Sequence, residues 1–275
     1  MGGAGIAARR MQKALLKNGV AAGFLSKDLC IGFEGEELKD DFFNYSPPGM
    51  VHRLKAKLKV IMGQPATISE QLKKLRPQLH CEFISSPEAN FELQQHALVQ
   101  EADIIHLHWI NGIVHFETFF KAINKPVFWT LHDMNPFQGM FHYAEDQQRN
   151  ATKAAAVDEV IVNLKKQSYA HLAQLTLVSP SAWLLEAARQ SAVFPSTATF
   201  VELANGLDFS KYERDIKTEN VEEQLKLLYV SDRLFNTRKG AELLMEALDL
   251  LAIDVELLAM GNGSIRIKNP RVGVT

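Results

Sequence analysis

The chain has 275 residues, with 30 lysines and arginines against 32 aspartates and glutamates, so its formal net charge is −2 with histidines neutral. Hydrophobic residues make up 47% and charged residues 23%, which is typical of a globular protein with one large or two modest domains. This composition excludes a disordered or fibrous protein. It also argues against a general nucleic-acid binder, which needs an excess of positive charge to neutralise phosphates.

Cysteine content and hydropathy bear on the cellular compartment. Cys30 and Cys81 are too few for a disulfide scaffold or a cysteine-rich zinc site. The sequence has no run of about 18 apolar residues that could cross a membrane, and its N-terminus lacks the apolar core of a signal peptide. We therefore expect a cytoplasmic protein, and peripheral contact with the inner face of the cell membrane stays open.

The first third of the chain begins with glycines followed by an amphipathic helix over residues 6–18, which Gly19 ends. Its predicted apolar side contains Ile6, Met11, Ala14 and Leu15. A short apolar run over residues 20–25 predicts a buried strand. Two further helices are predicted over residues 55–62 and 68–75, the second beginning at Ser69 with Glu70.

Strands and helices alternate through the middle of the chain. Strands are predicted over residues 103–109, 126–131 and 175–178, and helices over residues 114–123, 157–173 and 181–189. This alternation indicates a parallel sheet with helices on both faces.

A second domain is predicted beyond a turn at residues 205–208 and a polar linker at residues 211–224. It contains a strand over residues 225–230, a helix over residues 240–251 and a strand over residues 255–260. With only about 50 residues it is shorter than a complete α/β domain. We expect the apolar side of its helix, which includes Leu243, Leu244 and Leu248, to lack a full sheet to pack against.

The N-terminal glycines allow two functional interpretations. Residues 3–8 fit the pattern G-x-G-x-x-A, and Asp28 lies near the distance of the ribose carboxylate in a dinucleotide fold, which would indicate an NAD(P)-binding enzyme. The alternative is a helix start of small residues that packs closely. In either case the backbone N–H groups of a helix N-terminus favour an anion.

Four histidines stand near predicted strand ends: His106, His108, His132 and His142. Imidazole is a common metal ligand, but no acidic residue or cysteine at a suitable spacing completes a site. We therefore predict no metal, and expect these histidines to form the hydrogen-bonded wall of a cleft.

Arg233 and Lys239 bracket a short loop between a strand and the N-terminus of a helix. Both cations can reach a phosphate held at that end of the helix. The alternative is a solvated loop that binds nothing.

The order and spacing of these segments resemble glycosyltransferase family 4, retaining enzymes with two facing Rossmann-like domains in the GT-B fold. Residues 102–112 together with residues 129–137 are most similar to the branch that builds bacterial surface polysaccharides and exopolysaccharides such as colanic acid. The other matching segments are residues 2–5, 179–183, 205–208, 233–240 and 261–263.

The resemblance implies an α/β fold, with an acceptor-side domain over residues 1–206 that lacks its first strand and a partial nucleotide-sugar domain over residues 207–275. It implies sugar transfer from a nucleotide-diphosphate donor to a glycan or lipid-linked acceptor, without a metal or other cofactor. Arg233 and Lys239 match the pair that stabilises the leaving diphosphate, and His132, beside Asp133 as its orienting partner, matches the histidine near the reacting sugar. The residues implied in donor binding, besides that cation pair, are Gly3, Ala4, Gly5, Gly261 and Asn262.

The chain departs from the family pattern at two places. No strand precedes the glycines, and the family's pair of glutamates eight residues apart does not occur before Thr275. A catalytically inactive remnant and a nucleotide-binding module therefore stay open as alternatives to an active enzyme.

Overall fold

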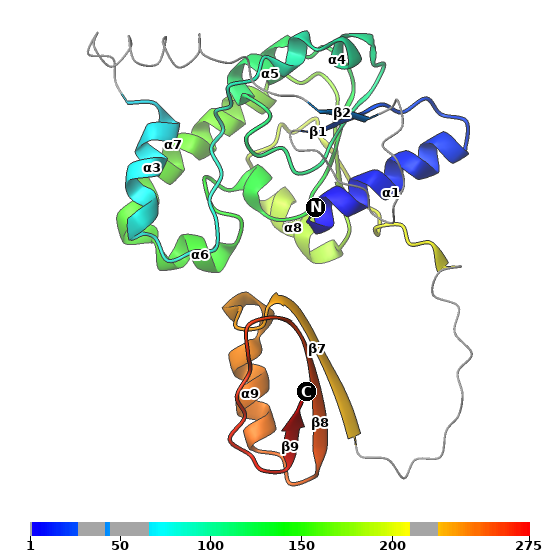
Figure 1. Ribbon diagram of the computed structural model, residues 1–275. Coiled ribbons are helices and arrows are strands. Elements are labelled where there is room, and N and C mark those ends of the chain that lie inside the picture. The colour runs from blue at the N-terminus through cyan, green and yellow to red at the C-terminus, as the bar shows by residue number, and fades with distance from the viewer. Residues whose placement is uncertain (1, 27–41, 45–65, 210–224) are drawn as a thin grey trace. The chain divides into compact units, whose positions relative to one another are not determined.

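The computed structural model of this protein describes residues 2–26, 42–44, 66–209 and 225–275 (Figure 1). The chain divides into two compact units, Met1–Asp208 and Phe209–Thr275. The division lies two residues from the boundary expected at residue 206. Each unit is an α/β structure built on parallel strands.

The described residues of the first unit form two parallel sheets and the helices around them. Its strands are β1 (Phe24–Ser26), β2 (Phe42–Asn44), β3 (Ile105–Leu107), β4 (Val127–Thr130), β5 (Leu175–Ser179) and β6 (Thr199–Glu202). Its α-helices are α1 (Gly3–Lys17), α3 (Ile68–Leu75), α4 (Ala97–Glu101), α5 (Phe116–Ala122), α6 (Ala144–Arg149), α7 (Ala151–Tyr169) and α8 (Ala182–Gln190). Single-turn 3₁₀ helices among its described residues are η2 (Arg76–Gln78), η3 (Leu93–Gln95) and η4 (Asn135–Phe137).

The predicted parallel sheet is confirmed in the order β3-β4-β5-β6. Ile105 pairs with Val127, Val127 with Leu175, and Thr176 with Thr199. Strands β1 and β2 form a second parallel pair, which no strand of the described residues joins to β3. Because all strands of the larger sheet run the same way, their carboxyl ends meet at one edge, where ligands bind in open α/β sheets.

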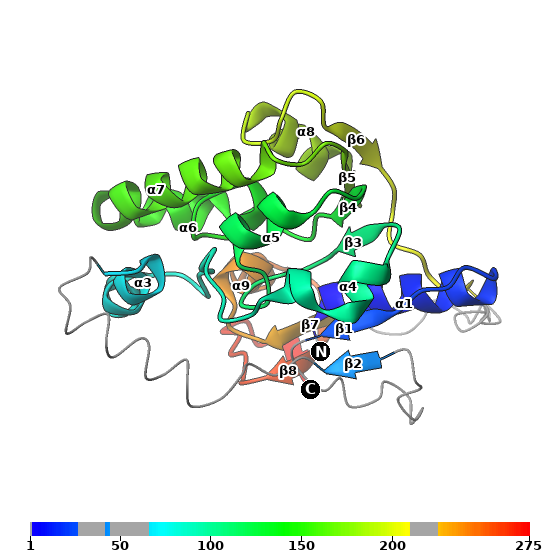
Figure 2. The same cartoon turned by 90° about the horizontal axis from the view of Figure 1, so that it is seen from above.

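The large core lies between this sheet and its helices. Helix α7 packs beside α5 and α3 (Figure 2). Five aromatic rings that touch one another form the centre of the core: Phe116, Phe120, Trp129, Tyr169 and Phe194. The Tyr169 hydroxyl donates to the carbonyl of Pro136 at 2.7 Å, so this buried phenol is satisfied.

Helix α1 differs from the prediction at its start and on its buried side. It begins at Gly3 instead of Ile6, so the glycines form its first turn and not a preceding loop. Its buried residues are Ala8 and Gln12, whereas Ala14 is exposed. The polar Gln12 is tolerated there because its side-chain amide donates to the carbonyl of Ala22 at 2.8 Å.

Helix α3 has the predicted bounds, but its N-cap is Thr67 and not Ser69. Thr67 and Glu70 form a reciprocal capping box. The carboxylate of Glu88 accepts the next two free N–H groups, from Ile68 at 3.0 Å and Ser69 at 2.8 Å. This contact ties α3 to the 83–88 segment, which leads into the pocket described below.

Over residues 225–275, the second unit is a three-stranded parallel sheet with one α-helix. Its elements are β7 (Leu225–Arg233), the 3₁₀ turn η6 (Thr237–Lys239), α9 (Ala241–Asp249), β8 (Val255–Asn262) and β9 (Val272–Val274). The strand order is β7-β8-β9. Gly240 begins α9 with a φ of +73°, a left-handed conformation that favours glycine.

The expectation that the apolar side of α9 would lack a sheet to pack against is wrong for most of its residues. Leu248 is buried, and Leu244 and Leu251 are partly buried in a core with Val255 and Leu257, whereas Leu243 and Ala247 stay exposed. The opposite face of the sheet is the exposed one, with four large apolar side chains that are 37–63% exposed: Leu228, Val230, Leu258 and Met260. One helix covers one face of this sheet, and the other face remains apolar.

The remaining elements follow the predictions to different degrees. Helix α7 begins six residues earlier than predicted, directly after Asn150, whose side chain bonds to His80 and Asp146. Elements β2, α4, α6, β6 and β9 were not predicted because each has only three to six residues. Outside the described residues lie the helix predicted over residues 55–62, the linker predicted over residues 211–224, Asp28 and Cys30. No helix in the described part of the chain has the length and apolar character needed to span a membrane.

Candidate functional site

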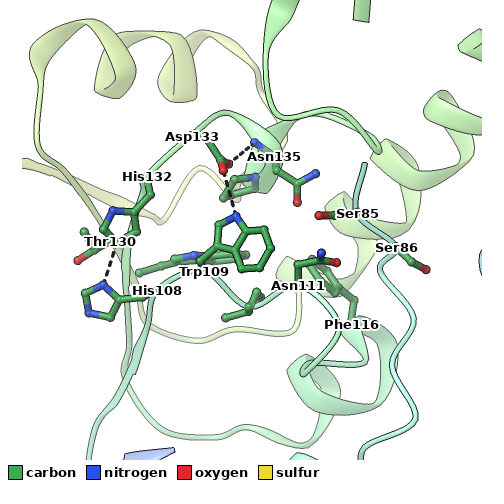
Figure 3. A pocket seen from close by; sticks show the side chains of 13 residues that line it. Ser85, Ser86, His108, Trp109, Asn111, Phe116, Thr130, His132, Asp133 and Asn135 are labelled. Atoms are coloured by element: carbon green, nitrogen blue, oxygen red, sulfur yellow. Dashed lines mark hydrogen bonds between the residues drawn. The ribbon is translucent and has the colours of Figure 1, made fainter. Parts of the chain in front are cut away.

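A pocket opens at the carboxyl ends of β3 and β4 in the first unit (Figure 3). Residues that follow these two strands supply most of its wall, and the 83–88 segment and the start of α5 complete it. The lining residues are Ser85, Ser86, His108, Trp109, Ile110, Asn111, Phe116, Trp129, Thr130, His132, Asp133, Asn135 and Pro136. The pocket therefore lies where parallel α/β sheets bind ligands.

Three half-buried imidazoles stack along the carboxyl ends of these strands. The His106 and His108 rings lie 4.5 Å apart, and the His108 and His132 rings 5.3 Å apart. His108 Nδ1 and His132 Nε2 share a hydrogen bond of 3.0 Å, and His106 Nε2 bonds the Thr130 hydroxyl at 2.8 Å. The orienting partner of His132 is thus His108, which directly follows the neighbouring strand β3, and not Asp133, because consecutive residues of an extended segment point to opposite sides.

These imidazoles are neutral near pH 7. Burial, together with the neighbouring His106 and His132, lowers the pKa of His108 to about 3. Burial also lowers the pKa of His106 and of His132, although the carboxylate of Asp133 partly opposes the shift at His132. A neutral imidazole both donates and accepts a hydrogen bond, so His132 can contact a hydroxyl while it keeps its bond to His108.

Asp133 points the other way and organises a second chain of hydrogen bonds. Its Oδ2 accepts from the indole N–H of Trp109 at 3.2 Å and lies 2.7 Å from His142 Nδ1, and its Oδ1 accepts the backbone N–H of Asn135 at 2.9 Å. On its other side, His142 Nε2 bonds the Ser85 hydroxyl at 2.6 Å. These bonds fix the carboxylate and the indole in one position (Figure 3).

Ser85, His142 and Asp133 are connected in the same order as the residues of a hydrolase triad. A nucleophilic serine needs an open approach for the carbonyl carbon and free N–H donors for the oxyanion. Ser85 is only 4% exposed, His142 is 1% exposed, and the Ser85 N–H donates to the carbonyl of Met140 at 2.9 Å. These contacts favour a structural role for Ser85 and His142, whose hydrogen bonds hold Asp133 in place and, through Asp133, the indole of Trp109.

Two side chains of α7, Lys165 and Asp158, form hydrogen bonds with the backbone of the loop that follows His132. The buried ammonium of Lys165 donates to the carbonyls of Gln138 at 2.9 Å and Gly139 at 2.8 Å, and also to that of Asn135. Asp158 accepts the N–H of Met140, and a side chain on Gly139 would lie 2.1 Å from the Asp158 carboxylate. Position 139 therefore requires glycine.

The second unit holds the two predicted cations at one end of its sheet. Arg233 ends β7 and Lys239 ends η6, two residues before the start of α9, and both are exposed. Within the described residues neither forms an ion pair with a carboxylate. The positive N-terminal end of α9 begins two residues after Lys239, so this end of the unit favours an anion.

Gly261 and Asn262 have structural contacts at the same end of the second unit. A side chain on Gly261 would lie 1.8 Å from the carbonyl oxygen of Ser231, so glycine lets β8 approach β7 closely. The Asn262 amide donates to the carbonyl of Asp232 at 3.1 Å. In the first unit, Gly3, Ala4 and Gly5 form the first turn of α1, where helical N–H groups lack intrahelical partners.

Of the four histidines expected in the wall of a cleft, His108 and His132 line the pocket, whereas His106 and His142 do not. Other residues around His132 were not predicted. Trp109, Asn111 and Ser85 join it in the pocket, although Ser85 is 47 positions away in the chain. Trp109 and Asn111 stood within a family-like segment, whereas nothing in the pattern around Ser85 indicated its position. Among the described residues no group of three or more histidine, cysteine, aspartate or glutamate side chains is arranged to hold a metal ion.

Comparison with known proteins adds no assignment. No protein-family model matches the chain, and no curated protein is significantly similar to it in sequence. The candidate function therefore depends on the pocket of the first unit, the cations of the second and the motifs in the sequence.

Proposed function

We propose that this protein is a retaining glycosyltransferase, or part of one, that moves a sugar from a nucleotide-diphosphate donor to a glycan or lipid-linked acceptor. The observation that carries the proposal is the pocket at the carboxyl ends of β3 and β4, with the neutral His132 in its wall. This histidine stands in one of the segments that resemble the transferases of surface-polysaccharide synthesis.

The chemistry of the pocket supports a ligand with many hydroxyl groups. His132, Thr130 and Asn111 offer neutral donors and acceptors, and His108 fixes the orientation of the His132 ring through their 3.0 Å bond. In the proposed reaction His132 binds a hydroxyl of the transferred sugar and holds its reacting carbon in place. Positioning of this kind acts on the transition state.

The cations of the second unit support the donor half of the proposal. As the glycosidic bond to the donor loosens, negative charge develops on the departing diphosphate. The Arg233 guanidinium and the Lys239 ammonium would stabilise this charge through charge-assisted hydrogen bonds. Backbone N–H groups at the start of α9 would add donors to the same phosphates.

Calorimetric titration of the full chain with UDP, GDP and ADP tests the proposal directly. We expect binding of at least one nucleotide, and a loss of about tenfold in affinity for Lys239→Ala, because one charge-assisted contact to phosphate is worth about 1.5 kcal/mol or more. Lys268→Ala is the matched control, since the exposed Lys268 follows β8 near Asp249, at the opposite end of α9.

If one of these nucleotides binds, a nucleotide sugar with the same base is then offered as donor together with simple glycosides as acceptors. Sugar transfer to the glycoside and release of free nucleoside diphosphate are measured. Absence of binding to all three nucleotides would refute the donor half of the proposal. Equal losses for Lys239→Ala and Lys268→Ala would show that general charge, and not this site, attracts the nucleotide.

A further inference from the structure

The pocket contains a large aromatic surface to which the proposed function assigns no role. Trp109 is 46% exposed although it lines the pocket, while Trp129, the other indole in the wall, is 2% exposed. A half-exposed indole at the centre of a pocket leaves a flat apolar surface available to a ligand (Figure 3).

The indole is held on the side away from the opening. Its N–H donates to Asp133 at 3.2 Å, and its ring centroid lies 5.9 Å from that of His142 and 6.3 Å from that of Phe83, the latter in a T-shaped contact. Asp133 is itself fixed by His142 and by the Asn135 N–H. The ring is therefore preorganised, and a ligand that stacks on it does not have to restrict its motion first.

The charge of the wall indicates which class of ligand fits. The lining residues in the described part of the chain include no lysine or arginine, and the carboxylate of Asp133 is largely buried and saturated by its three partners. The imidazoles of His108 and His132 are neutral near pH 7. A nucleotide would leave its phosphates without cations here, whereas a neutral sugar on the indole needs none and would find the side-chain amide of Asn111 beside it (Figure 3).

We propose that Trp109 is the stacking platform of an acceptor subsite, where the apolar face of a neutral pyranose ring lies on the indole and its hydroxyls bond the neutral wall. The C–H groups on one face of a pyranose form a flat apolar surface of about the size of the indole, so their contact gains dispersion and burial. The identification of this sugar as the acceptor depends on the proposed function; the subsite itself depends on Trp109 and its wall.

Saturation-transfer NMR on the full chain, with methyl glycosides of glucose, galactose and mannose as probes, tests the subsite. For at least one probe we expect transfer that is strongest at the ring protons of one face, and a loss of about tenfold in affinity for Trp109→Ala. Trp109→Phe keeps an aromatic face and should keep measurable binding even though it loses the bond to Asp133. Trp183→Ala is the matched control, because Trp183 is 68% exposed on α8 and does not line the pocket.

A second measurement tests the subsite in a chain that keeps Trp109, so its result does not depend on whether the Trp109 variants fold. In the Trp183→Phe background the remaining tryptophans are Trp109 and the buried Trp129, so acrylamide quenching reports on Trp109. A bound glycoside should protect this fluorescence from acrylamide. Three outcomes would each overturn the subsite. The first is no saturation transfer to any of the three glycosides, and the second is an equal loss of glycoside affinity in Trp109→Ala and Trp183→Ala. The third is protection from acrylamide by UMP but not by the glycosides.

The two proposals fail separately. Glycoside binding at Trp109 without any nucleotide binding would overturn the donor half of the proposed function and leave a carbohydrate-binding subsite. Nucleotide binding that depends on Lys239, without glycoside binding, would leave the transferase proposal and overturn the role of Trp109.

Discussion

At the scale of single residues, the consecutive side chains of His132 and Asp133 after β4 make different contacts. His132 faces the stacked imidazoles and bonds His108, while Asp133 bonds Trp109 and His142. The alternation of side chains along an extended backbone separates them. The same loop therefore supplies a neutral polar group to the pocket wall and a buried carboxylate that holds the indole.

We predict that His132→Ala reduces turnover of a nucleotide sugar by roughly tenfold to a hundredfold, because a misplaced reactant loses the advantage of positioning. Thermal stability should change little, since His132 is only half-buried at the edge of the sheet. The comparison is kcat and Tm for His132→Ala and for His106→Ala, whose ring bonds Thr130 and does not line the pocket. A large drop in Tm with kcat intact would instead make His132 a structural residue.

The neutral imidazoles also predict how stability depends on pH. The pKa of His108 is about 3 in the folded chain and about 6.5 in an unfolded one, so below pH 6.5 the unfolded state binds more protons. The unfolding free energy should therefore fall as the pH drops from 6.5 toward 4, with His108 contributing up to about 1.4 kcal/mol per pH unit. Urea unfolding at several pH values measures this slope.

His108→Gln should make that slope shallower by about one proton, because the amide keeps a hydrogen bond to His132 but does not titrate. His171→Gln, at an exposed position, provides the matched histidine-to-glutamine control. An unchanged slope in His108→Gln would mean that His108 carries a proton in the folded state.

At the scale of elements, the link between α7 and the pocket loop is a buried lysine. Burial lowers the pKa of Lys165 to about 7, although Asp158 and Asp133 oppose the shift. The loop carbonyls of Gln138 and Gly139 depend on this side chain for hydrogen bonds. Helix α7 therefore stabilises the backbone that carries Asp133 and Asn135.

Lys165→Met should lower the unfolding free energy by on the order of 2 kcal/mol, because buried carbonyls lose their donor. The folded pKa of Lys165 lies below its usual value, so between about pH 7 and pH 10 the unfolded state binds more protons and wild-type stability rises with pH. The difference between the wild type and the variant should widen over that window in urea unfolding. Lys166→Met, at the exposed neighbouring position, should show neither effect; a difference that stays constant with pH would contradict the lowered pKa.

Much of the fold was predictable at this scale because strand and helix periods are local properties. The alternation over residues 103–189 predicted β3 to β5, α5 and α8 within a few residues of their observed bounds. The start of α1 and the cap of α3 were wrong by two or three positions, since glycines extend the first helix and Glu88, twenty residues away, bonds the N–H groups of the second. Short elements such as β9 have too few residues to show a period.

The site was less predictable than the fold. His132 could be selected because it stands in a family-like segment, but its bond to His108 and the wall contributed by Ser85 arise from tertiary contacts. The direction of Asp133 toward Trp109 and His142 likewise depends on where the loop after β4 folds back. The pattern of residue types along the sequence does not show which of these side chains lie within hydrogen-bond distance of one another in the fold.

At the scale of the whole molecule, the two units differ in how completely their sheets are covered. The first unit buries a continuous aromatic core, with Phe119, Leu131 and Leu177 fully inaccessible. The second buries Leu257 and Val255 under α9, while Leu228 and Val230 remain exposed on the other face of the same sheet. An exposed apolar patch of this kind is typical of a surface that associates with something or causes aggregation.

This asymmetry predicts opposite outcomes for substitutions on the two faces of the second unit. The double variant Leu228→Thr/Val230→Thr should raise the solubility of the chain and leave its thermal unfolding nearly unchanged, because these side chains are 63% and 62% exposed in the folded state and threonine suits a strand. Leu257→Thr is the matched change on the covered face, where the side chain is fully buried. It should lower the unfolding free energy by roughly 2 to 4 kcal/mol, since it removes apolar contacts and buries a hydroxyl. Precipitation midpoints in polyethylene glycol and calorimetric melts measure the two effects. If the double variant destabilised the chain as much as Leu257→Thr, the outer face of the sheet would have to be buried in solution, and the contrast between its faces would be wrong.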